Sequence, residues 1–216
     1  MPLPFMHSRE PAIEPVADGA IWLKGWLPQD RQAVLAEQCR TMIDAEGYVP
    51  TVRGGGKMHV RMLCLGRHWN PLTYRYEPTR GDYDGHPVPP LPPDWAALAS
   101  QVAADAGFSF TPDVCLINFY DDDGRMGAHQ DKDESPASIA EGAPVVSVSI
   151  GDTARFLFGG LKRRDPVQSI LLESGDAFVF GGPSRLRYHG VSRILPGTAP
   201  ATLGLTGRFN LTFRRF

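Results

Sequence analysis

The chain has 216 residues, of which 42% are hydrophobic, and 22 Lys and Arg against 24 Asp and Glu give a formal net charge of -2. This length and composition allow one complete globular core, with room for a small second lobe. The near-balanced charge excludes a global electrostatic attraction to nucleic acid or anionic membranes, so any such affinity must be local.

The cysteines and the N-terminus indicate the compartment. Cys39, Cys64 and Cys115 are odd in number and show no C-x-x-C spacing, which favours reduced thiols. The opening residues MPLPFMHSREP lack an apolar signal core, and no apolar run approaches membrane-spanning length. We therefore expect a cytoplasmic protein without a membrane partner.

The first half of the chain predicts two helices joined by irregular sequence. Residues 1–20 are proline-rich and without periodicity, and are expected to form an irregular arm. One amphipathic helix is predicted over residues 28–45, before Gly47, and a second ends before Gly107. The proline-rich residues 81–95 are expected to be an extended spacer. The apolar positions behind the helices are Val34, Leu35, Cys39, Met42 and Ile43 in the first, and Trp95, Leu98, Val102 and Ala106 in the second.

A basic segment lies between these helices. Residues 51–76 contain five Lys or Arg, no Asp or Glu, and three aromatic residues. Such a mixture is typical of surfaces that stack single-stranded bases, although a solvated loop with packing aromatics explains it equally well.

After Asp113 the sequence becomes a series of short β-rich runs separated by Gly, Pro, Asp or Asn. This spacing predicts a mainly β, α+β domain with a double-sheet jelly-roll core. We expect one domain over residues 1–216, divided into a helical and lid region, 1–110, and a jelly-roll core, 111–216. The runs are DVCLINFY, PVVSVSI, ARFLFGG, SILLESGDAFVFGG, RYHGV and RFNLTFRRF.

Three residues have the spacing of a metal site. His129 and Asp131 form an H-x-D pair, whose side chains share one side of an extended segment, and His189 follows 58 positions later. Two histidines and one carboxylate are the ligand set of non-heme Fe(II) oxygenases. H-x-D alone is weak, because a surface His-Asp pair is the commoner explanation.

The last strand has two chemically distinct faces. Arg208, Asn210, Thr212 and Arg214 alternate with apolar residues. If the arginine face meets water, the strand needs no further explanation. If it faces an enclosed space, it requires an anionic ligand, and a dicarboxylate would suit both the guanidinium forks and an open metal site.

Taken together, these segments resemble the AlkB family of Fe(II)- and 2-oxoglutarate-dependent dioxygenases, especially its bacterial DNA-repair members. The likeness covers most of residues 110–214 and is weaker over 50–78. It implies a double-stranded β-helix (jelly-roll) core with N-terminal helices and a nucleotide-covering lid. It also implies oxidative demethylation of bases such as N1-methyladenine or N3-methylcytosine, with release of formaldehyde, succinate and CO2. The matching segments are DVCLINFY, HQDKDE, PVVSVSIG, FGGLKRRDP, LLESGDAFVFGG, SRLRYHG and RFNLTFR.

The resemblance also implies roles for individual residues. His129, Asp131 and His189 would be the catalytic metal ligands. Arg208 would hold the far carboxylate of 2-oxoglutarate, and Arg214 would approach the carboxylate nearer the metal. The remaining 2-oxoglutarate residues would be Asn118, Tyr120 and Asn210.

The same likeness suggests how a base would be held. Trp69 and His129 would sandwich it and Asp133 would contact it, which suits a base made cationic by methylation. Trp69 could instead be a core or lid aromatic. Tyr74, Tyr76 and Arg163 match positions that hold the substrate or its backbone, although each could be surface packing.

The sequence departs from the family at residues 134–144, ESPASIAEGAP, where we expect a longer loop. The expected partner is alkylated single-stranded DNA, with RNA and double-stranded DNA as further candidates, and the expected state is a monomer. One alternative is an oxygenase of the same fold acting on a protein or small molecule. Another is a non-catalytic metal-binding or nucleic-acid-binding module.

Overall fold

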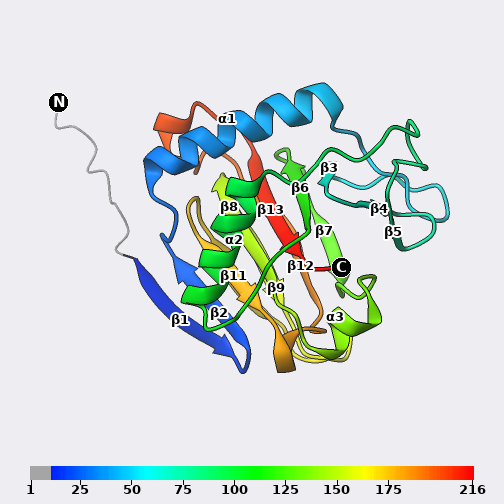
Figure 1. Cartoon of the computed structure of the whole chain (residues 1–216). Helices are drawn as coiled ribbons and strands as arrows, with labels where there is room; N and C mark the ends of the chain where they lie inside the picture. The colour runs from blue at the N-terminus through cyan, green and yellow to red at the C-terminus, as the bar shows by residue number, and fades with distance from the viewer. Residues whose placement is uncertain (1–10) are drawn as a thin grey trace.

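The computed structural model describes residues 11–216, which form two facing antiparallel sheets, a small hairpin and two covering helices (Figure 1). The seven-stranded sheet has the order β1-β2-β11-β8-β13-β6-β3. Its strands are β1 (Ala12–Ala17), β2 (Ala20–Lys24), β11 (Ala177–Phe180), β8 (Val145–Gly151), β13 (Arg208–Arg214), β6 (Val114–Tyr120) and β3 (Arg61–Leu65).

The second sheet has four strands and closes over the first. Its order is β10-β9-β12-β7, and a separate hairpin pairs β4 with β5. The strands are β10 (Gln168–Leu172), β9 (Thr153–Phe158), β12 (His189–Leu195), β7 (Met126–His129), β4 (His68–Asn70) and β5 (Arg75–Glu77). The expected jelly-roll core is confirmed.

Strand β13 shows why the core divides into two layers. Phe209, Leu211 and Phe213 face the helices, where they pack in an apolar cluster with residues of both. Arg208 and Arg214, on the opposite face, are buried between the sheets at 1% and 8% exposure. The arginine face therefore meets an enclosed space and not water. This is the case in which the strand requires an anionic ligand.

Both predicted helices are present and cover the outer face of the large sheet (Figure 1). They are α1 (Gln29–Glu46) and α2 (Pro93–Asp105). In α1 the expected apolar face is wrong at one position: Val34 is 55% exposed, and Ala36 is buried instead. The inward stripe of α1 thus runs through Leu35, Ala36, Cys39 and Ile43.

The prediction of an irregular arm over residues 1–20 is wrong where it can be compared. Residues 1–10 lie outside the described part, but β1 and β2 form a hairpin over Ala12–Lys24. Pro15 suggests irregular sequence, yet proline is tolerated on an edge strand such as β1. Gly19, with φ of 72°, makes the turn.

Residues 134–144, expected to be a longer loop, contain a short helix, α3 (Pro136–Ala140). The Ser135 hydroxyl accepts a hydrogen bond from the Ser138 N–H and so caps the helix.

Two other expectations concern the cysteines and the absence of a membrane-spanning segment. The three cysteines are buried and free, and no helix within residues 11–216 is long and apolar enough to cross a bilayer.

Candidate active site

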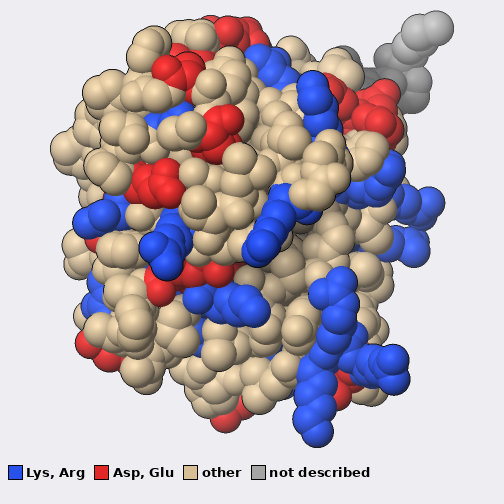
Figure 2. Space-filling view, turned by 90° about the vertical axis from the view of Figure 1, so that its right-hand side faces the viewer, with Lys and Arg blue, Asp and Glu red and all other residues tan. Residues whose placement is uncertain are grey.

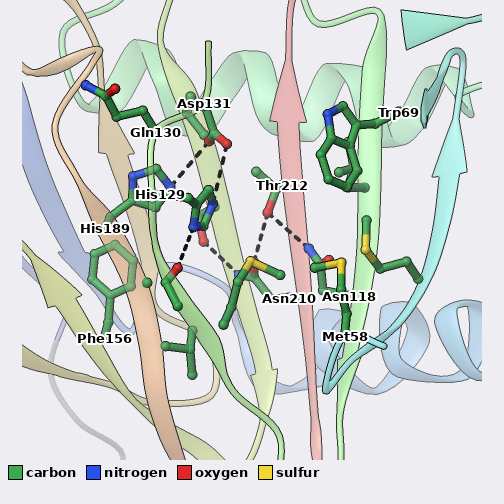
Figure 3. A pocket seen from close by; sticks show the side chains of 18 of the residues that line it. Met58, Trp69, Asn118, His129, Gln130, Asp131, Phe156, His189, Asn210 and Thr212 are labelled. Carbon is green, nitrogen blue, oxygen red and sulfur yellow. Dashed lines mark hydrogen bonds and ion pairs between the residues drawn. The ribbon is translucent and has the colours of Figure 1, made fainter. Parts of the chain in front are cut away.

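A cavity of about 840 Å³ opens between the two sheets, beneath the β4–β5 hairpin. Its walls come from strands of both sheets and from the segment that follows β7. Figure 3 shows His129, His189 and Asp131 turned toward one another on one side, with Trp69 standing apart from them. Segments distant in the sequence therefore share one enclosed space.

The three predicted metal ligands meet in this cavity. His129 ends β7 and His189 begins β12, and the two are directly paired across the ladder. The Asp131 carboxylate lies 3.6 Å from His129 Nε2 and 3.4 Å from His189 Nε2. One potential ligand atom from each residue lies within 4.8 Å of the others, the only such group of three or more found within residues 11–216.

Backbone carbonyls fix the orientation of both imidazoles. His129 Nδ1 lies 2.9 Å from Gly127 O, and His189 Nδ1 lies 3.0 Å from Arg187 O. A carbonyl can only accept, so each Nδ1 carries the proton and each Nε2 presents its lone pair to the cavity. This arrangement prepares neutral imidazoles for metal coordination.

The protonation states also suit a divalent cation. Burial, reinforced by His189, lowers the pKa of His129 to about 4. Burial alone would raise the pKa of Asp131, but Arg214 and His189 hold it well below its usual range. Asp131 Oδ2 is buried and accepts no hydrogen bond from the described residues. An anionic carboxylate oxygen without a hydrogen bond, beside two imidazoles oriented by backbone carbonyls, fits Fe(II).

Arg208 is the clearest unsatisfied cation in the cavity. Its Nη2 donates to Ser149 Oγ at 2.9 Å, whereas its Nε and Nη1 find no acceptor within residues 11–216. Burial lowers its pKa to about 10, so it remains charged at neutral pH. A buried guanidinium with free donors is costly unless an anion joins it, which fits a carboxylate of 2-oxoglutarate.

The polar residues beside Arg208 are already ordered. Asn210 donates to Ser147 Oγ at 2.7 Å and accepts from the Thr212 hydroxyl at 2.9 Å. Asn118 Oδ1 is buried without a hydrogen-bond partner in the described chain. Tyr120 lines the same wall, and burial raises its pKa to about 12, so its hydroxyl keeps its proton.

Arg214 differs from the expectation, because other side chains already occupy much of its guanidinium. Its Nη2 donates to Asp131 Oδ1 and its Nη1 to the Tyr76 hydroxyl, both at 2.6 Å. Its Nε lies 3.4 Å from Glu134. Burial would lower the pKa of Arg214, but Asp131 and its neighbours raise it well above its usual value.

Most of the predicted substrate residues line the cavity: Trp69, Tyr74, Asp133 and Arg163. The Trp69 indole donates to Asp133 at 2.8 Å, and Tyr74 meets the Trp69 ring edge-on at 6.2 Å. Burial raises the pKa of Asp133. The Arg163 guanidinium lies 5.7 Å from the Tyr188 ring centre.

Tyr76, also predicted to hold the substrate, is not among the residues that line the cavity. Its side chain is only 7% exposed, and its hydroxyl is engaged by Arg214 and donates to Glu134 at 3.2 Å.

The residues of the basic segment 51–76 have different roles: Trp69 and Tyr74 line the cavity, whereas two of the arginines do not. Arg61 donates to Ile43 O and Arg67 lies 4.2 Å from the Phe216 ring centre, so both serve packing.

Sequence reasoning missed Glu134 and Arg185. Both side chains are buried and pair at 2.8 Å behind the metal ligands. Glu134 belongs to HQDKDE and Arg185 to SRLRYHG, so each lies close to a predicted ligand in the sequence. That proximity was the available signal, but it did not indicate that the two would meet.

Comparison with known proteins identifies the family. The model of the 2OG-Fe(II) oxygenase superfamily matches residues 19–214. The chain is 42% identical to DNA N(6)-methyladenine demethylase ALKBH1C of Arabidopsis thaliana over 93% of this chain and 49% of the relative, so it spans about half that protein's length. It is 40% identical to the alpha-ketoglutarate-dependent dioxygenase AlkB of Salmonella typhimurium, over 99% of this chain and 97% of that one.

Solved structures agree with this relationship. The structure of OsALKBH1 superposes with a TM-score of 0.89 at 37% identity and covers 95% of this chain and 100% of that one. A Pseudomonas putida prolyl-4-hydroxylase, at 15% identity and a TM-score of 0.54, covers 92% of this chain and 93% of that one and shares the fold alone. The chain therefore belongs to the AlkB family of the 2OG-Fe(II) oxygenase superfamily.

Proposed function

We propose that this protein is an Fe(II)- and 2-oxoglutarate-dependent dioxygenase that demethylates alkylated bases in nucleic acid. The superfamily is named for both cofactors. The observation that carries the proposal is the meeting of His129, Asp131 and His189 in one cavity with the Arg208 guanidinium, whose Nε and Nη1 lack acceptors in the described chain. The names of the relatives, demethylases and a nucleic acid dioxygenase of Mus musculus among them, support the substrate class.

The metal would be held by the two Nε2 atoms and the Asp131 carboxylate. Three protein ligands leave positions for the co-substrate and for dioxygen. When bound, Fe(II) and 2-oxoglutarate would activate dioxygen, one oxygen atom entering succinate, which leaves with CO2, and the other hydroxylating the base's methyl group, later lost as formaldehyde. The protein supplies the ligands, the orientation and the exclusion of water.

Arg208 would bind the far carboxylate of 2-oxoglutarate, since its Nε and Nη1 are donors without acceptors in the described chain. Asn210, held by Ser147 and Thr212, would be preset to meet the co-substrate, and Asn118 and Tyr120 would complete the wall. Arg214 would act first on Asp131, to which it is already bonded, and only second on the carboxylate nearer the metal.

The methylated base would lie between Trp69 and His129, with Asp133 at its edge. The Trp69 indole already fixes the Asp133 carboxylate, and an aromatic face with a carboxylate favours a cationic base. Tyr74 and Arg163 would hold the substrate or its sugar-phosphate backbone beside that base. Substrates of this kind include N1-methyladenine and N3-methylcytosine.

Single-stranded DNA would be the preferred form, because extruding a base from an unpaired strand costs least. Figure 2 shows Lys and Arg side chains projecting from the face that carries the β4–β5 hairpin. Exposed cations at the cavity include Lys132 and Arg163. This local charge compensates for the absence of a global one. We further propose a cytoplasmic monomer, the buried free thiols supporting a reducing compartment.

The test is formaldehyde release from a methylated single-stranded oligonucleotide, with Fe(II), ascorbate and 2-oxoglutarate each omitted in turn. We expect release to require Fe(II) and 2-oxoglutarate. Activity that survives without 2-oxoglutarate contradicts the mechanism. Parallel assays with methylated RNA, duplex DNA, methylated protein and free amino acids rank the substrates, and turnover only on protein or amino acids would favour the alternative oxygenase.

A further inference from the structure

Four charged side chains form a buried network that includes one metal ligand and the residues behind it. Its members are Asp131, Glu134, Arg185 and Arg214, and the hydroxyl of Tyr76 joins them. The side chains of Glu134 and Arg185 are 0% and 3% exposed. Two carboxylates balance two guanidiniums, so the network is neutral and each charge depends on the others for compensation.

Arg185 restrains the main chain of Asp131. Asp131 lies beyond the end of β7 and outside regular structure, so no ladder hydrogen bonds position it. The Arg185 Nη1 donates to Asp131 O, its Nε to Ala143 O at 2.7 Å and its Nη2 to Glu134 at 2.8 Å. One planar fork therefore ties the metal-ligand segment to the loop before β8.

Glu134 restrains the side chain of Asp131 through Arg214. Its carboxylate lies 3.4 Å from Arg214 Nε, and Arg214 donates to Asp131 Oδ1 at 2.6 Å. Without Glu134, Arg214 would lose one of its two carboxylate partners. The Arg214 guanidinium could then turn, and the direction of its hydrogen bond to Asp131 would change with it.

The network also reaches the β4–β5 hairpin, which we call the lid hairpin. Trp69 and Tyr76 are direct cross-strand partners in it. Trp69 bonds to Asp133 and Tyr76 bonds to Glu134. The two partners of the hairpin are thus attached to consecutive residues of the segment that carries Asp131.

We propose that Glu134 and Arg185 are positioning residues that fix the Asp131 carboxylate and, through Tyr76, couple the lid hairpin to occupancy of the metal site. This inference rests on the proposed function, since it assumes that the site holds a metal. Coupling of this kind is reciprocal: whatever orders the metal site also orders the lid hairpin, and the reverse.

The first test is metal affinity, with Co(II) as an air-stable probe read by its visible absorption. Glu134→Gln and Arg185→Lys should each weaken Co(II) binding by roughly 10-fold or more, as outer residues of metal sites do. The matched control is Glu141→Gln. This substitution removes a carboxylate from the solvent-exposed ion pair with Arg215 and should leave the Co(II) affinity unchanged.

The second test measures amide hydrogen exchange across residues 68–77 with and without Co(II) and 2-oxoglutarate. Loading should slow exchange in the wild type and in Glu141→Gln, but not in Tyr76→Phe, which removes one hydroxyl and keeps the ring. Thermal melting confirms that each variant is folded. If Glu134→Gln does not fold, Arg185→Lys and Tyr76→Phe carry the test.

Wild-type Co(II) affinity in the folded network variants, together with wild-type protection in Tyr76→Phe, would overturn the inference. Neither measurement uses nucleic acid. A wild-type protein that releases no formaldehyde from methylated oligonucleotides would therefore refute the proposed substrate and leave these results to stand on their own.

Discussion

The jelly-roll core and the lid hairpin hold their functional residues in different ways. In the core, His129, His189 and Arg208 lie on strands whose ladders fix where each side chain points. The lid hairpin pairs only β4 with β5 and joins neither large sheet. Its aromatic residues are held to the rest of the molecule by side-chain hydrogen bonds, Trp69 to Asp133 and Tyr76 to Glu134 and Arg214.

The difference separates two kinds of specificity. Chemistry that all members of a fold share can be built into a rigid ladder, because its geometry never needs to change. Substrate recognition placed on a lightly attached hairpin can vary without disturbing the ladder. Changes in the core should therefore affect metal and 2-oxoglutarate. Changes to lid residues that face the base should affect the oligonucleotide, whereas changes to Tyr76, which joins the lid to Glu134 and Arg214, should affect both.

The largest effect is expected from Asp131→Ala. Loss of a metal ligand should lower demethylation by more than about 100-fold, and Arg214 would lose its closest carboxylate, costing about 3–5 kcal/mol of stability. Formaldehyde release, Co(II) titration and thermal melting measure these effects. Asp123→Ala, in the exposed turn before β7, is the control. Unchanged Co(II) affinity in Asp131→Ala would contradict the assigned site.

Arg208→Met should separate binding from stability within the core. Loss of a charge-assisted contact of about 1.5–3 kcal/mol would weaken 2-oxoglutarate binding by roughly 10-fold to 100-fold. The melting temperature without 2-oxoglutarate should not fall, because the substitution removes a buried charge two of whose three nitrogens lack acceptors in the described chain. Calorimetric titration and melting curves check both. A variant that melts earlier but binds 2-oxoglutarate normally would show that Arg208 is structural.

Trp69→Ala tests the lid side of the comparison. Removing a stacking surface worth about 1–3 kcal/mol per base should raise the KM for a methylated oligonucleotide by roughly 10-fold. The KM for 2-oxoglutarate should stay at the wild-type value. Steady-state kinetics in both substrates decide the matter, with Leu72→Ala, at an exposed position between β4 and β5, as the control. Equal changes in both KM values would mean that Trp69 acts on the 2-oxoglutarate site as well as on the base.

The smallest effect is expected from Lys57→Ala, an exposed residue beside the cavity-lining Met58. If Lys57 meets a phosphate, its loss should weaken binding uniformly across sequences and reduce the salt slope for single strands by about 0.7. Fluorescence anisotropy at several salt concentrations measures this. Arg61→Ala is the matched comparison, because Arg61 is held by Ile43 O away from the cavity, and it should leave the slope unaltered.

How much the sequence could predict follows the same division. Helix α1 and the two faces of β13 were predictable because each has a strong local period. His129, Asp131 and His189 were a candidate metal site from their spacing, and the polar face of β13 and then the resemblance strengthened that interpretation. By contrast, Val34 was misassigned at the border of the apolar stripe of α1, where periodicity alone does not decide between exposure and burial.

The network behind the metal site had no local signal. Arg185 and Glu134 are 51 positions apart, and Arg214 and Tyr76 are 138 apart. A lone Glu or Arg in a loop normally indicates a solvated residue. Only the folded chain shows that these side chains leave water together. The hairpin of β1 was missed for a different reason, since Pro15 obscured a strand that is possible only at a sheet edge.

The direct pairing of His129 with His189 has one more consequence. Because side chains alternate along a strand, shifting β12 by a single residue against β7 would turn one imidazole out of the cavity. Correct alignment of these strands and competence to bind iron would then be a single event. A misaligned molecule would bind no iron. It would therefore release no oxidant from an incompletely formed active site into the cell.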